Sequence, residues 1–269
     1  MLNIYDYEPF HVYSSYDDDA PQLDKSDFSF STVLKACLIT GYGDKQPPQD
    51  WTMPVDDIEN TGTRAFSSTA ILSSHCIFTV THDTSDKFVM TATAADADTA
   101  FATTTRSKKM FNFKSETQDW FVIANNQSCY VLLQTDVGTP LFAVFFFGSA
   151  YTTEAIKQRP VLWGGDYRYE AVNYSINRMQ LTDEHNQKWY KKQIFDDDIN
   201  AGTQHVFCAP IFKSDMYGIF LPGLVEHAGQ LNTNNHYLKI ADTASDILMF
   251  KTAWAQLQNF GVVLKGSYT

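Results

Sequence analysis

Residues 120–135 read WFVIANNQSCYVLLQT. The middle segment, Asn125-Asn126-Gln127-Ser128, is polar and consists of residue types that are common in turns. Short runs rich in β-branched, aromatic and other apolar residues flank it on both sides. Two such runs around a short polar turn predict two antiparallel strands joined in a hairpin. The hairpin indicates a β protein.

Segments of the same character occur on both sides of the hairpin. In the first half, the predicted strands are residues 64–72, 76–81, 87–92, 120–125, 129–135 and 141–147. In the second half, they are residues 169–176, 206–211, 217–221, 236–241, 247–252 and 260–265. Aromatic residues make up 14% of the chain, which favours pleated, half-buried surfaces. We therefore expect a mainly β fold with one or two antiparallel β-sandwich or barrel-like domains.

One short helix is predicted near the N-terminus. In residues 28–39 (FSFSTVLKACLI), apolar residues recur at spacings of three and four, which is the helical period. These residues are Phe30, Val33, Leu34, Cys37 and Leu38. Ser29 or Ser31 is expected to cap the start of the helix, and Gly41 to end it in a left-handed conformation. Pro47 and Pro48 prevent its continuation.

The segment after the helix, GYGDK (residues 41–45), has two readings. It could be a glycine loop that binds a ligand, or the place where the helix stops. It follows a helix, leads into prolines and lacks the GxxxxGK[ST] spacing of a phosphate loop. We interpret Gly41, Tyr42 and Gly43 as a structural turn, with Trp51 as its buried anchor. The two glycines are expected to adopt backbone angles that other residues resist.

The 269 residues suit one large domain or two smaller ones. A cluster of turn residues in 148–168 suggests a domain boundary there. We expect an N-terminal β-rich domain, 1–150, and a C-terminal β-rich domain, 151–269. The alternative is a single domain. Residues 1–28 are polar and acidic, and predict an extended arm or an early edge strand. Residues 94–102 are a helical turn or a loop, and the polar segment 182–204 predicts a surface excursion.

Net charge and apolar run length argue against two classes of partner. The net charge is −11, which repels phosphate backbones and argues against nucleic acid. The short basic cluster Arg106-Ser107-Lys108-Lys109 is interpreted as a solvated loop. The longest apolar run, residues 141–147, is far shorter than the roughly 20 residues of a membrane-spanning helix. We expect no membrane partner.

Motifs for catalysis and metal binding are missing from the sequence. There is no GxSxG, HExxH or GxGxxG motif, and the closest histidines, His75 and His82, would face opposite sides of a strand. The triplets 17–19 and 196–198, all aspartate, are interpreted as solvated turns because they lack a calcium-loop pattern. The four scattered cysteines are expected to be buried free thiols, which fits a reducing cytoplasm. We therefore expect no enzyme, no catalytic residue, no cofactor and no metal.

One combination of residues resembles a known family. CLITGYGDK, residues 37–45, together with Trp51, is similar to a CLxxGYGxK…W signature near the start of a family of tailed-phage virion proteins. The hairpin 120–135 and the segment GIFLPGL, 218–224, resemble later parts of that family. Ser149 departs from the Asp expected after Phe-Gly, and residues 75–115 depart more widely. The resemblance implies a non-enzymatic structural component of a tailed phage or prophage particle, in the tail or at the head–tail junction.

Such a component would be assembled in the cytoplasm of the bacterial host and located in the virion. Its partners would be other virion proteins and further copies of itself in a symmetric ring or array. The candidate partner contacts are aromatic residues of the arm and of the segment before 170: Tyr5, Tyr7, Phe10, Trp163 and Tyr167. Two alternatives remain, a capsid decoration protein and a carbohydrate-binding tail module that stacks sugars on Trp163 and Tyr167.

Overall fold

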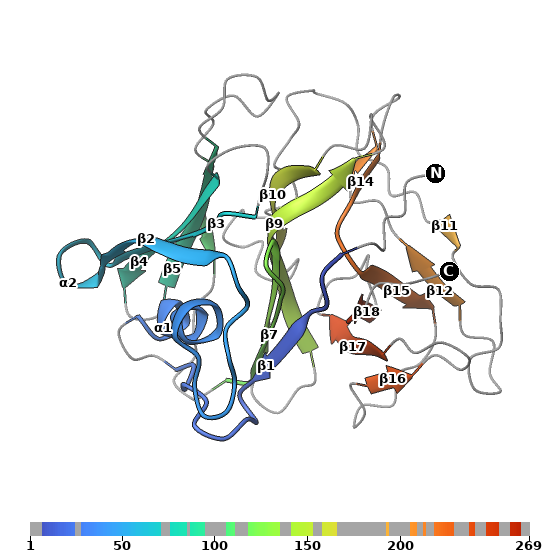
Figure 1. Cartoon of the computed structure of the whole chain (residues 1–269), viewed down its shortest axis with the longest axis horizontal. Coiled ribbons are helices and arrows are strands. Elements are labelled where there is room, and N and C mark those ends of the chain that lie inside the picture. Colours follow the sequence, from blue (N-terminus) through green and yellow to red (C-terminus); the bar gives the residue numbers. More distant parts are fainter. Residues whose placement is uncertain are drawn as a thin grey trace.

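A computed structural model gives the fold of the chain (Figure 1). It describes residues 7–24, 28–70, 76–84, 87–94, 106–110, 118–134, 141–152, 158–165, 192–193, 205–208, 212–213, 218–228, 237–239, 246–252 and 259–264. The fold is mainly β with one short N-terminal helix, as predicted. Within the described residues, no helix is long and apolar enough to cross a membrane.

The smaller of the two sheets has five antiparallel strands in the order β2-β3-β4-β5-β6. Their bounds are β2 (Trp51–Asp57), β3 (Thr63–Ser68), β4 (Cys76–Thr84), β5 (Lys87–Ala94) and β6 (Arg106–Met110). The short helix α2 (Ile58–Thr61) connects β2 to β3. The basic cluster in β6 was predicted to be a loop; this was wrong, because its backbone pairs with β5 from Phe88↔Met110 to Ala92↔Arg106.

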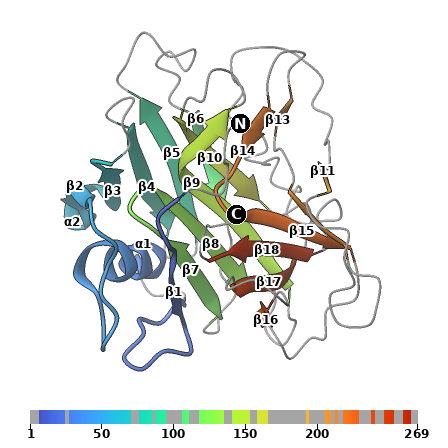
Figure 2. The ribbon, with the colours of Figure 1, turned by 45° about the vertical axis from the view of Figure 1, so that its right-hand side comes forward.

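The larger sheet has thirteen strands and branches at two of them. Its first half consists of β1 (His11–Ser14), β7 (Trp120–Ala124), β8 (Ser128–Gln134), β9 (Leu141–Thr152) and β10 (Gln158–Gly165). Its second half consists of β11 (Lys192–Gln193), β12 (His205–Cys208), β13 (Phe212–Lys213), β14 (Gly218–Phe220), β15 (Leu224–Ala228), β16 (Tyr237–Lys239), β17 (Asp246–Thr252) and β18 (Asn259–Val263). Figure 2 shows β15, β17 and β18 beside the central strands.

The hairpin predicted from residues 120–135 is confirmed, and it lies at the centre of the molecule. β7 pairs with β8 from Trp120↔Leu133 to Ala124↔Cys129, and β8 pairs in turn with β9. Every residue of β7 and β8 is buried. Alternate residues belong to different cores: Trp120 and Val122 to one, Phe121 and Ile123 to the other. The strands are apolar at nearly every position because both faces of this sheet are covered.

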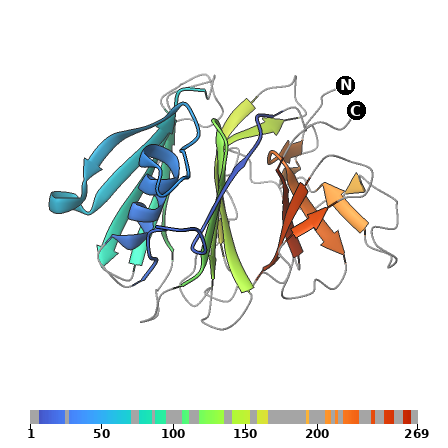
Figure 3. The same cartoon turned by 60° about the horizontal axis from the view of Figure 1, so that its bottom comes forward.

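Three layers result from this two-sided burial (Figure 3). The first core lies between the central strands, the five-stranded sheet and α1 (Ser29–Lys35), and includes Phe30, which stacks on Phe88 at 3.9 Å. The second core lies between the central strands and the C-terminal strands, which contribute Leu224, Leu248, Phe250 and Val262. The central strands are therefore the shared middle layer.

Strand β9 connects the two halves of the sequence. It pairs with β8 on one side and β10 on the other, and its first two residues pair in parallel with β17. The turn cluster at 148–168 was read as a boundary or connection, but most of it belongs to the paired strands β9 and β10. The boundary placed between 150 and 151 falls inside β9.

The predicted helix is confirmed, whereas its predicted caps need correction. α1 continues into a π-helical turn, η1 (Ala36–Thr40). The N-cap is Phe28, in a left-handed conformation with φ 68°, and no side chain caps the helix. The hydroxyls of Ser29 and Ser31 instead donate to the carbonyls of Asp24 and Phe28, and neither side chain caps the start of the helix.

Several predicted segments need adjustment or lie outside the described residues. The strand predicted at 64–72 ends at Ser68, and the later predicted strands in the described part agree to within a few residues. The strands that were not predicted include β2, β10, β11, β13 and β15. The segments 169–176 and 95–102, and most of 182–204, lie outside the described residues.

Candidate functional site

The residues that carry the family resemblance lie together between the N-terminal arm and the central hairpin. The turn begins at Gly41 and Gly43, whose φ angles are 72° and 53°. A Cβ on Gly41 would lie 2.5 Å from the Lys45 carbonyl oxygen, and one on Gly43 would lie 2.7 Å from the Asp18 carbonyl oxygen. Both positions therefore require glycine. Gly41 does not take the left-handed helical conformation expected of a helix stop, because its ψ is 173°.

Asp17 links the arm to this turn. Its carboxylate accepts hydrogen bonds from the Ser14 backbone N–H at 2.7 Å and from the Tyr42 hydroxyl at 2.8 Å. The Lys45 ammonium lies 3.4 Å from the other carboxylate oxygen and donates to the Val12 carbonyl at 3.2 Å. The first aspartate of the triplet is thus a structural hub, whereas Asp18 and Asp19 are exposed, as expected for a solvated turn.

A buried phenol, Tyr13, and a half-buried one, Tyr42, lie next to Asp17. Tyr13 is 1% exposed and donates to the Gln46 carbonyl at 2.7 Å. Its ring lies 6.1 Å from that of Tyr42, which lies edge-on against Trp120 at 6.3 Å. Burial raises the pKa of both tyrosines well above the ordinary value. Both phenols therefore stay protonated at neutral pH and act as hydrogen-bond donors.

Trp51 connects the turn to the far end of the hairpin. It is the first residue of β2, is 7% exposed and lies edge-on against Phe147. Its indole N–H donates to the Asn125 carbonyl at 2.6 Å. The Asn125 side chain holds the hairpin turn by accepting from the N–H groups of Gln127 and Ser128, and it donates to the Glu8 carbonyl at 2.8 Å. One asparagine thus joins arm, turn and hairpin.

Two thiols lie in the same core. Cys37 of η1 and Cys129 of β8 are free, and each is fully buried. Burial raises the pKa of both thiols well above the ordinary value. A protonated, inaccessible thiol is neither a nucleophile nor a metal ligand at neutral pH. These two cysteines match the prediction of buried free thiols.

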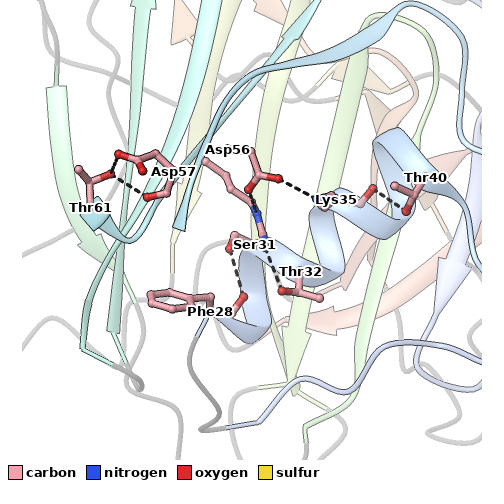
Figure 4. A network of polar contacts seen from close by, with 9 residues as sticks. Phe28, Ser31, Thr32, Lys35, Thr40, Asp56, Asp57 and Thr61 are labelled. Atoms are coloured by element: carbon pink, nitrogen blue, oxygen red, sulfur yellow. Dashed lines mark hydrogen bonds and ion pairs between the residues drawn. The ribbon is translucent and has the colours of Figure 1, made fainter. Parts of the chain in front are cut away.

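A network of polar contacts fixes the helix to the five-stranded sheet (Figure 4). Asp56 pairs with Lys35 at 2.7 Å and with the Arg64 Nε at 2.8 Å. The same guanidinium donates to the hydroxyls of Ser31 and Thr32 in the first turn of α1. The hydrogen bond from Lys35, then that from Arg64, lowers the pKa of Asp56. This network holds α1 against the five-stranded sheet.

The predicted partner contacts are dispersed. Tyr5 and Tyr167 lie outside the described residues, and Trp163 lies in β10 opposite Phe146 of β9. Tyr7 is half-buried. Phe10 is 7% exposed, packs on Tyr130, and its N–H donates to the Leu264 carbonyl at 2.8 Å. In this chain Phe10 therefore covers the second core.

An exposed aromatic residue that the sequence analysis did not single out lies at the opposite end of the arm. Tyr16 is 63% exposed, and its ring lies 5.8 Å from that of Phe121. Its hydroxyl donates to the Asp119 carboxylate at 2.6 Å. Partial burial, and then the hydrogen bond and charge of Asp119, raise the pKa of Tyr16 to about 12. The side chain is held in one position at the surface.

Among the described residues, no group of three His, Cys, Asp or Glu side chains could hold a metal ion. His82 lies in β4 between the rings of Phe28 and Phe88, while His75 and the triplet 196–198 lie outside the described residues. Comparisons with protein-family models, curated proteins and solved structures gave no match.

Proposed function

We propose that this chain is a structural component of a tailed phage particle, in the tail or at the head–tail junction. It carries no catalytic activity and assembles through protein–protein interfaces with other virion proteins and with copies of itself. The observation that supports this proposal most strongly is the structural role of the residues in the CLxxGYGxK…W signature. Gly41, Tyr42, Gly43, Lys45 and Trp51 all hold the arm, the turn and the hairpin together.

This arrangement supports a structural role because its contacts hold the arm, the turn and the hairpin in one conformation. The turn is closed by reciprocal backbone hydrogen bonds between Tyr42 and Lys45, at 2.8 and 3.2 Å. Long-range bonds then connect it to residues more than seventy positions away, as between Trp51 and Asn125. A subunit of a symmetric assembly needs such a frame, because each interface must recur with the same geometry in every copy.

Gold labelling of intact particles tests the proposal. Antibody raised against the recombinant chain should label one end of the tail or the head–tail junction. A matched control uses the same antibody after absorption with the purified chain, which should remove the label. Label spread over the shell would favour the decoration protein, and particles without any label would contradict a virion role.

A further inference from the structure

The β1 segment, which we define as residues 7–14, is bound to the body of the chain in the way a separate strand would be. β1 stands at one end of the larger sheet and pairs with β7 over its whole length (Figure 1). In the described part of the chain, no other strand pairs with its second side. Phe10 packs in the second core and Tyr13 in the first. The segment therefore covers both cores at the edge of β7.

The polar groups that hold the β1 segment come from distant parts of the sequence. The Lys45 ammonium and the Gln46 carbonyl contact it across 33 positions, and the Asn125 amide contacts it across 117. The Leu264 carbonyl accepts from the backbone N–H of Phe10 at 2.8 Å. We call the edge of β7 together with these four groups the β1 site. None of the contacts requires the segment and the site to belong to one chain, so the segment of a second copy fits the site equally well.

A tight turn, residues 15–20, joins the β1 segment to the body. Two backbone hydrogen bonds, one from the N–H of Asp17 and one to its carbonyl, close the turn. Asp19 adopts a left-handed conformation with φ 59°, which is uncommon for a residue other than glycine. Directly after the turn, the Pro21 carbonyl accepts from the Trp120 indole N–H at 3.0 Å. Extension of this short, strained turn frees the segment while Pro21 stays in place, as strand exchange between copies requires.

We infer that the β1 segment of one copy occupies the β1 site of a second copy when copies are held close together. Exchange retains the contacts of the segment with the site. It loses the hydrogen bond from Tyr42 and the ion pair with Lys45 that Asp17 makes within one copy, so these contacts favour the unexchanged chain. A short linker keeps a segment at an effective concentration on the order of millimolar. Exchange therefore requires copies at a similar local concentration, as in a symmetric array.

The turn also limits how far apart exchanging copies can lie. Fully extended, the chain from Ser14 to Pro21 spans at most about 25 Å. Pro21 remains bound in its own copy and Ser14 pairs with β7 of the neighbour, so these two positions must lie within that distance. Mutual exchange gives a closed pair, whereas exchange in one direction gives a ring or an open chain. The inference rests on the proposed function, since it names the way in which copies of the chain are joined.

Disulfide trapping between two full-length variants tests the exchange. Val12 lies opposite Ile123 in the pairing of β1 with β7, and both side chains pack in the second core. In a mixture of Val12→Cys and Ile123→Cys chains, a disulfide between these positions joins two copies, because each chain carries only one of the two substitutions. Cys37 and Cys129 lie in the first core, on the other side of the central strands, and do not compete. Peptide mass identifies the joined positions.

The mixture is unfolded in urea and refolded at about 1 mM chain, which matches the effective concentration given by a short linker. The disulfide yield should be about tenfold that of a mixture of Val12→Cys with Val55→Cys, whose exposed position in β2 reports random collision. A single chain with both Val12→Cys and Ile123→Cys should form the same disulfide within one copy when dilute, which checks the geometry. A yield no higher than that of the collision control overturns the inference.

Sedimentation of chains without added cysteines gives an independent measurement. After refolding, the wild-type chain should associate at about 1 mM. Asp17→Ala should tighten this association about tenfold, because it removes contacts that only the unexchanged chain makes. Asp18→Ala removes the same charge from an exposed neighbour and should leave association unchanged. A wild-type chain that is monomeric at this concentration, or association that Asp17→Ala does not strengthen, overturns the inference. Gold label at the tail would in that case still support the proposed function.

Discussion

Trp51 offers the sharpest test of the structure, because one side chain joins the turn to the hairpin. Its ring is buried against Phe147, and its N–H reaches the Asn125 carbonyl at 2.6 Å. Replacement of a buried tryptophan by alanine costs about 3–5 kcal/mol through lost burial and the cavity left behind. We expect Trp51→Ala to lower the free energy of unfolding by this amount, a large part of the about 5–15 kcal/mol of a typical domain.

Trp51→Phe separates the two contributions. Phenylalanine keeps a ring for Phe147 but has no N–H, so Asn125 loses a hydrogen bond whose net value is about 0.5–1.5 kcal/mol. Urea unfolding followed by far-ultraviolet circular dichroism measures both variants. A common slope of free energy against urea shows that the denatured state has not changed. A midpoint of Trp51→Ala equal to that of the wild type would contradict the anchoring role.

Three further predictions concern stability and access. Gly148→Ala should destabilise the fold by more than about 1 kcal/mol in the same urea assay, because φ is 134° and the new Cβ would lie 2.4 Å from the Gln127 carbonyl oxygen; unchanged stability would refute the strain. The pKa of Asp56 is lowered in the fold, so its stabilising contribution is present above about pH 4 and is lost as the pH falls through the lowered value. Asp56→Asn should therefore reduce the loss of stability in acid. A pH profile of stability identical to that of the wild type would argue against the network. Cys37 and Cys129 should react with a thiol reagent only after unfolding; rapid labelling of either in the native chain, mapped by peptide mass, would disprove their burial.

The parts of the fold that the sequence predicts are those with a strong local pattern. The hairpin at 120–135 is apolar on both sides of a polar turn, and α1 shows helical spacing over its whole length. Strand β2 carries Pro54 and an irregularity between Thr52 and Val55, which an edge strand tolerates but a local reading does not favour. β6 is basic, and it is a strand because β5 offers an edge to it. Pairing across the chain outweighs local propensity there.

The signature site was predictable only in part, for the same reason. Glycines and a tryptophan at fixed spacing mark a turn and an anchor. The partners of these residues, Asp17 for Tyr42 and Asn125 for Trp51, are distant in sequence and have no local signal. The hydrogen bond of the exposed Tyr16 hydroxyl goes to Asp119, more than a hundred residues away. The burial of Phe10 likewise depends on Tyr130 and on the backbone of Leu264.

The shared middle layer has a consequence for biosynthesis. The apolar strands β8 and β9 leave the ribosome before β15, β17 and β18, the strands that later cover one of their faces. Until those strands arrive, a nascent chain presents Phe142, Val144 and Phe146 to solvent on an incomplete sheet, which is an aggregation hazard. Ribosome-stalled chains that end before β14 should therefore bind chaperones. The chaperones should dissociate once β18 has left the ribosome and packed on the sheet.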